Sequence, residues 1–247
     1  MSAEVLAVAI AIAFLAAACE SLTAFGFALV MVPLLSLAWE VKPAVVTSTV
    51  LGTVLLLPLL YEVRGHVQPG RVAPLLLGSF TGIPAGVIIL DRIDPTALEI
   101  VVAGVVIVAG LAVYLSPQLS LSRPLVPLSF VVGAMSGALR AATSMGGPPA
   151  VIYVLTFEHE VERFRATLLA LFVPSSLLTI AGLAIAGRIS GDVLLTVATG
   201  LPAVGLGALA GRWARGRASQ GVFRLAVLAL LFASSGAVLA SASGAFG

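Results

Sequence analysis

Long apolar runs separated by short polar segments make up most of the chain. Most runs are apolar on every face, which is typical of helices that satisfy their own backbone groups in lipid. We therefore predict an all-α polytopic membrane protein with about eight to ten transmembrane or re-entrant helices. The apolar runs cover 3–19, 22–38, 44–61, 72–90, 97–115, 125–139, 144–157, 166–186, 192–211 and 222–240.

The composition supports a membrane location. Charged residues make up 10% of the 247 residues, hydrophobic residues make up 60%, and the mean hydropathy is +1.16. A soluble domain carries roughly 25% charged residues, so these few charges cannot cover a water-exposed surface. The pI of about 9.1 reflects arginines in the loops, and we expect the lipid bilayer, not nucleic acid, as the partner of this chain.

One stretch near the start of the first half of the chain resembles one stretch near the start of the second half. CESLTAFGF at Cys19–Phe27 aligns with LRAATSMGG at Leu139–Gly147, and Gly26 falls on Gly146. Paired hydrophobic segments that are interrupted by glycine or proline in both halves are typical of transporter binding sites. The alignment therefore predicts an internal repeat with a broken hairpin in each half.

We expect an N-terminal repeat over 1–118 and a C-terminal repeat over 119–247. Each repeat has a broken hairpin, at 3–38 and at 125–157, followed by three spans. An odd number of spans inverts the second repeat relative to the first. If each hairpin were instead one long crossing, the halves would be parallel.

Basic residues in the loops fall into two groups of unequal size if each hairpin returns the chain to the side it came from. The positive-inside rule puts the larger group in the cytoplasm and therefore both termini outside, in the periplasm. The smaller group consists of Lys42, Arg92 and Arg188. The larger group consists of Arg64, Arg71, Arg123, Arg163, Arg165, Arg212, Arg215 and Arg217.

Polar residues crowd inside the apolar hairpins, beside glycines and prolines that resist helix formation. An unwound backbone at membrane depth is tolerated only inside protein or beside a water-filled cavity. The half-helix that follows such a break points its positive end at it, an arrangement that binds anions. We predict a substrate site at the midplane from Glu20, Ser21, Thr23, Gly26, Phe27 and Pro33 of the first hairpin and Arg140, Thr143, Ser144, Gly146, Gly147 and Pro148 of the second.

Two ionisable residues, Glu20 and Arg140, occupy matching positions in these breaks. A guanidinium offers planar, bidentate donors to oxyanions, so we expect Arg140 to recognise the anion. Glu20 would pair with Arg140 in the empty state or carry a coupling proton. The alternative is that both side chains lie at helix ends and reach out to water.

Other polar positions allow two interpretations. The hydroxyls of Thr47, Ser48 and Thr49 either line the pathway or bond back to helix carbonyls. Gly78, Gly82 and Gly86, spaced by four, indicate close packing of helices. The sequence lacks a P-loop and the usual motifs of hydrolases and metal sites, so we expect neither an enzyme nor a metal ion nor any other cofactor.

Two stretches resemble the signatures of the TauE/SafE sulfite exporter family. FGFALVMVPLL at Phe25–Leu35, followed by KPAVVTST at Lys42–Thr49, is similar to the first signature, and GAMSGALRAATSMGGPPAVIY at Gly133–Tyr153 is similar to the second. The resemblance covers nearly the whole chain. It implies a multi-pass carrier of the bacterial inner membrane that moves small sulfur-containing or organic anions outward. It also implies a site that uses Gly26, Phe27, Pro33, Gly146, Gly147 and Pro148.

We therefore predict a secondary exporter of sulfite or an organosulfonate such as sulfoacetate, driven by protons or by the membrane potential. The outward movement of an anion gains about 2.3 kcal/mol per charge for every 100 mV of negative-inside potential. Alternatives are a channel-like anion pathway, a carrier of small carboxylates and, least favoured, a membrane enzyme or assembly subunit. A homodimer is compatible with the sequence. The exact substrate, the coupling ion and the number of crossings stay open.

Overall fold

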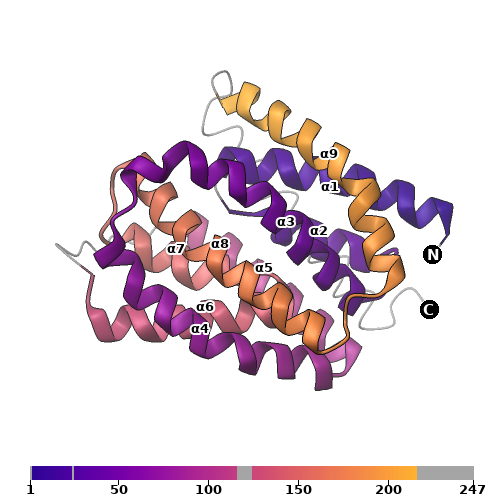
Figure 1. Cartoon of the computed structure of the whole chain (residues 1–247), viewed down its shortest axis with the longest axis horizontal. Coiled ribbons are helices and arrows are strands. Elements are labelled where there is room, and N and C mark those ends of the chain that lie inside the picture. The colour runs from indigo at the N-terminus through magenta and orange to yellow at the C-terminus, as the bar shows by residue number, and fades with distance from the viewer. Residues whose placement is uncertain (1, 24, 116–123, 216–247) are drawn as a thin grey trace.

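The computed structural model describes residues 2–23, 25–115 and 124–215, and this part of the chain is helical without a strand (Figure 1). The all-α prediction is therefore confirmed. The predicted span at 222–240 lies outside the described residues. In chain order, the elements are α1 (Ala3–Thr23), α2 (Phe27–Ser36), α3 (Val41–Val63), the 3-10 turn η1 (Arg64–His66), α4 (Pro69–Arg92), α5 (Pro95–Leu115), α6 (Val126–Thr143), α7 (Gly147–Leu155), α8 (Val161–Ile185) and α9 (Gly191–Arg215).

Six of the described helices are long and apolar enough to cross a membrane: α1, α3, α4, α6, α8 and α9. Helices α2 and α7 have only 10 and 9 residues. At 1.5 Å per residue each is about 15 Å long, half of the roughly 30 Å hydrocarbon core. Each hairpin thus joins one long helix to one half-length helix, in agreement with a mixture of transmembrane and re-entrant segments.

The two hairpins break about four residues later than the sequence pattern predicts. We expected Glu20 and Arg140 to lie inside the breaks, but both residues are helical, in the last turns of α1 and α6. The first break lies between Thr23 and Phe27, and the second lies between Thr143 and Gly147. The turns come where the backbone adopts a positive φ, at Gly26 (128°) and Ser144 (65°), conformations that end a right-handed helix. Polar side chains alone do not end a helix, because a helix supplies its own backbone partners.

The outer surface of the described helices is apolar. Large hydrophobic side chains with high exposure occur on several helices, including Leu77 and Ile88 on α4, Val131 on α6 and Leu206 on α9. A water-soluble monomer rarely exposes apolar patches of this extent. This surface is suited to lipid, and the protein is a multi-pass membrane protein.

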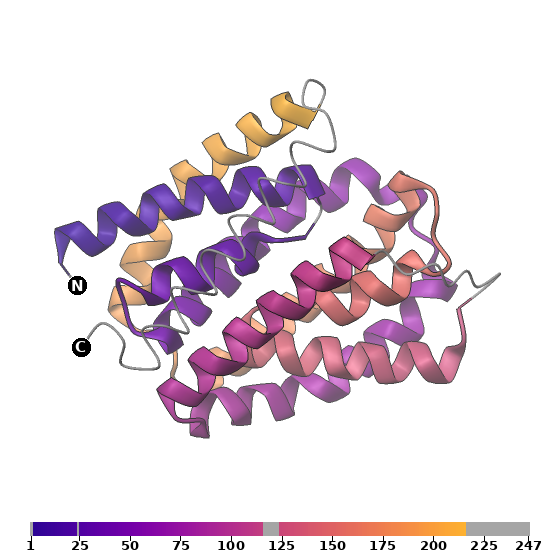
Figure 2. The same ribbon diagram turned by 180° about the vertical axis from the view of Figure 1, so that it is seen from behind.

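Two helix pairs pack with their backbones in contact. Helix α4 lies along α6, and α1 lies along α9, in both views (Figures 1 and 2). A Cβ atom added at Gly82 of α4 would overlap the carbonyl of Ala134 on α6, and Gly137 of α6 meets Ser79 of α4 in the same way. Gly207 of α9 meets the carbonyl of Phe14 on α1. The small residues therefore allow the backbones to approach closely, as their spacing predicted.

These contacts are reciprocal between the two parts of the chain. The long helix of the first hairpin, α1, packs on α9 from the C-terminal part of the chain. The long helix of the second hairpin, α6, packs on α4 from the N-terminal part. Helices α3 and α8, which follow the two hairpins, pack against each other. An exchange of two equivalent halves would produce this pattern, but the inverted repeat over 1–118 and 119–247 stays a prediction.

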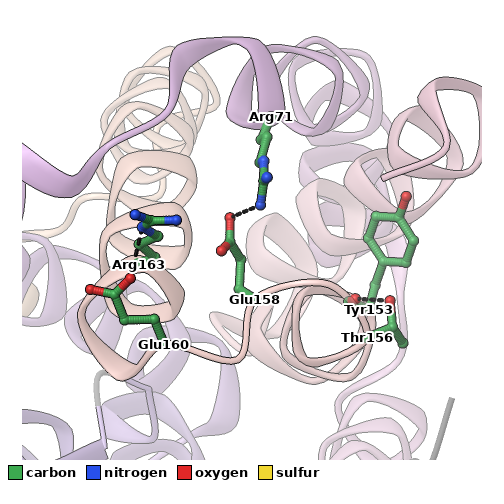
Figure 3. Close-up of polar contacts among 6 residues, drawn as sticks. All are labelled: Arg71, Tyr153, Thr156, Glu158, Glu160 and Arg163. Carbon is green, nitrogen blue, oxygen red and sulfur yellow. Dashed lines mark hydrogen bonds and ion pairs between the residues drawn. The ribbon is translucent and has the colours of Figure 1, made fainter. Parts of the chain in front are cut away.

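The charged loop residues gather at two opposite ends of the bundle. At one end, Arg188 pairs with Asp91, and Lys42 donates to the Asp91 carbonyl. At the other end lie several Arg–Glu pairs, including Arg71 with Glu158 at 2.8 Å (Figure 3). The described basic residues thus separate into the two groups that the loop pattern gives. Which end faces the cytoplasm stays a prediction.

The α4–α6 contact provides a direct test of the packing. We expect Gly82→Ala to lower the free energy of unfolding by about 1–3 kcal/mol or more, because the added methyl group meets backbone atoms that cannot rotate away. Thermal unfolding of the purified protein in detergent measures this change.

Gly205→Ala is the matched control, because Gly205 lies on α9 with no atom within 4 Å of its added Cβ. This variant should unfold at an unchanged or slightly higher temperature, since alanine favours helix more than glycine. Equal stability of the two variants would contradict the close packing of α4 on α6.

Candidate functional site

The breaks of the two hairpins meet around one small internal cavity. Phe25, in the first break, lies 3.8 Å from the position of a Cβ added at Gly147, where α7 begins. The cavity has a volume of about 40 Å³, room for about three water molecules. Its polar lining comes from Glu20, Ser48, Thr49, Thr53, Arg140, Ser144 and Ser176, and its remaining lining from Phe25, Gly26, Phe27, Ala28, Leu29, Gly52, Leu56, Met145, Gly147 and Phe172.

The cavity lies near the middle of the spanning helices. Gly52 is the central residue of α3, which runs from Val41 to Val63. Phe172 and Ser176 lie on either side of the centre of α8. A helix that crosses the bilayer has its central residues at about half depth, so the two half-helices α2 and α7 begin far from either surface.

The Glu20 carboxylate binds the first amide of α2. Its Oε2 atom accepts a hydrogen bond of 2.6 Å from the Phe27 amide nitrogen. Gly26, directly before the helix, provides the φ of 128° that turns the chain back. The first amides of a helix have no intrahelical acceptor and carry partial positive charge, so a carboxylate stabilises them there. The side chain of Glu20 is therefore the hydrogen-bond acceptor at the start of α2.

The second break is held by the backbone turn at Ser144 and by two hydroxyl side chains. Ser144 takes the left-handed conformation, and its amide donates to the Arg140 carbonyl at 2.8 Å, which closes the last turn of α6. Ser136 Oγ donates to the Gly146 carbonyl at 2.5 Å, and Thr143 Oγ1 accepts from the Met145 amide at 3.2 Å. These bonds satisfy backbone groups that the break removes from a helix ladder.

The two half-helices offer different groups to the cavity. Pro148 and Pro149 occupy the start of α7 and carry no N–H. At the start of α2, by contrast, Phe27, Ala28 and Leu29 all carry amides and all line the cavity. Amide donors to an anion therefore come mainly from α2, whereas α7 contributes the field of its N-terminal end.

Arg140 is buried against α8. Its Nη1 atom donates to Ser176 Oγ at 3.0 Å, and its guanidinium carbon lies 4.3 Å from the centre of the Phe172 ring. The contact with Ser176 is the only hydrogen bond of this guanidinium among the described residues. Phe172 fixes the plane of the group by a cation–π contact. The remaining N–H groups are therefore available to a ligand in the cavity.

Glu20 and Arg140 line the same cavity without forming an ion pair, so the pairing that the sequence suggested is not present. Each group has its own partner, the Phe27 amide for Glu20 and Ser176 for Arg140.

The residues predicted for the site lie in two layers. Those lining the cavity are Glu20, Gly26, Phe27, Arg140, Ser144 and Gly147. Five predicted residues lie outside the cavity lining. Ser21 faces Gly211 on α9, Pro33 is buried in α2, and Pro148 borders an apolar groove beside α5. Thr143 and Gly146 take part in the hydrogen bonds that hold the second break. Thr23 ends α1, and its side chain lies outside the described part.

Phe172 and Ser176, which hold Arg140, were missed in the sequence analysis. Pro174, Ser175 and Ser176 interrupt the apolar run of α8 and are the signal that points to this helix. Ser48 and Thr49 were assigned to either pathway or helix backbone. Both line the cavity, and Thr49 Oγ1 also donates to the Val45 carbonyl. Thr47 is buried outside the cavity.

The cavity offers donors for an anion. Among the described residues, no three His, Cys, Asp or Glu side chains come together in a way that could hold a metal ion. The guanidinium of Arg140, the α2 amides and the hydroxyls of Ser48, Ser144 and Ser176 are instead the groups that bind oxyanions.

Comparison with known proteins shows the same relationship as the sequence motifs. The family model described as sulfite exporter TauE/SafE matches residues 9–238. The chain is 23% identical over 199 residues to a protein of Cupriavidus necator named "Probable sulfite/organosulfonate exporter TauE". The aligned region covers 78% of this chain and 77% of that protein. No solved structure matches the chain.

Proposed function

Because the chain belongs to the TauE/SafE sulfite exporter family, we propose that it exports sulfite or a small organosulfonate and binds it in the cavity between the two hairpins. The observation that carries this proposal is the buried Arg140 guanidinium, which keeps free N–H groups in a cavity beside the start of α2. The name of the relative supports the class of anion.

The anion would replace water between Arg140 and the first turn of α2. The guanidinium and the amides of Ala28 and Leu29 are donors for its oxygens, and Ser48 and Ser144 provide hydroxyls. The volume of about 40 Å³ favours a compact anion such as sulfite over a longer sulfonate, which would require the cavity to widen.

We propose that Glu20 couples transport to protons. In the empty cavity its carboxylate accepts the hydrogen bond of the Phe27 amide, and its negative charge would repel an arriving anion. A proton on Glu20 removes that repulsion and weakens the bond to the amide, so anion and proton would bind together. If a dianion such as sulfite moves outward with one proton, one net negative charge leaves the cell, and the negative-inside membrane potential drives that movement.

Replacement of Arg140 tests the anion site. We expect Arg140→Met to raise the dissociation constant for sulfite by about 10- to 100-fold, because hydrogen bonds to a charged group contribute about 1.5–3 kcal/mol. Arg140→Lys should give a smaller increase, because lysine keeps the charge and loses the planar donors. Binding of radiolabelled sulfite to the purified protein measures both values.

Arg188→Met is the control, because Arg188 lies half-exposed at the end of the bundle and pairs with Asp91. It should bind sulfite as the unchanged protein does. Unchanged affinity in both Arg140 variants would remove Arg140 from the site, and a Tm measurement on each variant separates lost binding from unfolding.

Replacement of Glu20 tests the proton coupling. Glu20→Gln keeps an oxygen that accepts from the Phe27 amide but carries no negative charge, so we expect the fold and sulfite binding to persist. Export driven by an imposed pH gradient in proteoliposomes should fall at least about tenfold, while exchange of sulfite for sulfite continues.

Glu4→Gln is the matched control, since Glu4 lies exposed in the first turn of the same helix. It should keep the pH-driven export. Retention of that export by Glu20→Gln would show that the proton travels on another group or not at all.

The orientation is tested with introduced cysteines, because the natural Cys19 is buried. We propose that Gly65, next to the larger arginine group, faces the cytoplasm and that Gly191 faces the periplasm. Both are exposed, with no atom within 4 Å of an added Cβ. In intact spheroplasts a membrane-impermeant maleimide should label Gly191→Cys, and it should label Gly65→Cys only after permeabilisation. The reverse pattern would invert the topology.

A further inference from the structure

A second buried guanidinium lies in the first turns of α8. Arg165 is 5% exposed, and its Nε and Nη2 atoms have no hydrogen-bond partner. A buried guanidinium with unsatisfied N–H groups is costly, so such a group persists mainly where a partner arrives. Arg165 has no role in the anion binding and proton coupling proposed for Arg140 and Glu20.

The nearby carboxylates compensate Arg165 only weakly. Among the described residues at this end of the bundle, three Arg–Glu pairs have N–O distances of 2.7–2.8 Å, and two of these pairs appear in Figure 3. The fourth pair joins Arg165 Nη1 to Glu162 at 3.6 Å, too long for a hydrogen bond, and the Glu162 side chain is 47% exposed. Arg165 is therefore a buried arginine whose charge has only one distant, half-exposed carboxylate beside it.

Arg165 lies on the face of α8 that holds Arg140. Phe172 and Ser176, which contact Arg140, follow Arg165 by seven and eleven positions. These spacings bring all three residues to one side of a helix with 3.6 residues per turn. Arg165 is about 10 Å from Phe172 along the axis, toward the end of the bundle with the larger arginine group.

We propose that Arg165 forms a second oxyanion site, which an anion occupies on its way from the cytoplasmic end of the bundle to Arg140. The planar guanidinium presents two unsatisfied nitrogen atoms, a match for two oxygens of one sulfite or sulfonate group. The inference rests on the proposed function, because it takes the same class of anion and the same direction of movement.

A phospholipid head group carries the same kind of oxygens, so the experiment needs two sources of anion. The variants are Arg165→Met, which keeps a long apolar side chain without the charge, and Arg165→Lys. Arg163→Met is the matched control, because Arg163 lies two positions away, is 47% exposed and pairs with Glu160 at 2.8 Å. The unchanged protein and the three variants are purified in a neutral detergent for thermal unfolding. They are also reconstituted in phosphatidylcholine vesicles, with or without phosphatidylglycerol, for export measurements.

Without added anion, Arg165→Met should unfold at the same or a higher Tm than the unchanged protein, because it removes a buried charge that is only weakly paired. Its sulfite-dependent increase in Tm should be smaller. In phosphatidylcholine vesicles its maximal rate of sulfite export should fall about tenfold, while sulfite affinity at the Arg140 cavity is unchanged. Arg165→Lys should recover part of the rate, and Arg163→Met should match the unchanged protein.

Two results would overturn the inference. A Tm several degrees lower for Arg165→Met without anion, together with an unchanged export rate, would give Arg165 a structural role. Stabilisation through Arg165 by phosphatidylglycerol but not by sulfite would assign the guanidinium to a lipid head group instead. If the proposed function itself is wrong, the outcome differs from these two results, because the unchanged protein then neither binds nor exports sulfite.

Discussion

A helix that begins inside a membrane needs an acceptor for its first amides, and in this protein the Glu20 carboxylate provides one. Without it, the amide of Phe27 would lose its hydrogen-bond acceptor inside the protein, which costs free energy. The half-length α2 and the turn at Gly26 therefore meet at this contact, beside the cavity.

The second hairpin meets the same constraint differently. Two prolines at the start of α7 remove amides that would otherwise need acceptors. Ser136 and Thr143 satisfy backbone groups of the break, and Arg140 brings the positive charge. The two hairpins thus contribute unequal parts, with amides and a carboxylate from one and a guanidinium from the other. In the proposed function, this asymmetry assigns the attraction for an anion to one hairpin and the carriage of a proton to the other.

The sequence predicted the helices well because lipid leaves the backbone few choices. Apolar runs of sufficient length had to become helices, and α3, α4 and α8 lie close to their predicted ranges. The breaks were placed too early because Glu20 and Arg140 were taken to interrupt their helices. A polar side chain is compatible with a helix, whereas a positive φ is not, and only the fold shows which residue adopts it.

The site was harder to predict for a different reason. Residues close in sequence to the breaks, such as Ser21, turned out to face another helix, whereas Phe172 and Ser176 reach the cavity from α8. A motif identifies which segment carries polar groups but not which side of a helix faces which neighbour. That information depends on helix crossing, which the packing of distant segments sets.

The glycine contacts described above also limit how such a molecule can change shape. Each backbone-close pair, α4 with α6 and α1 with α9, joins helices that lie far apart in the chain. Interlocked backbones slide or separate poorly, since each glycine at these contacts lies against a backbone carbonyl of the neighbouring helix. The moving bodies during a transport cycle would therefore be these mixed pairs and not the N-terminal and C-terminal halves of the polypeptide. Cooperation between the halves is thus built into the units that move.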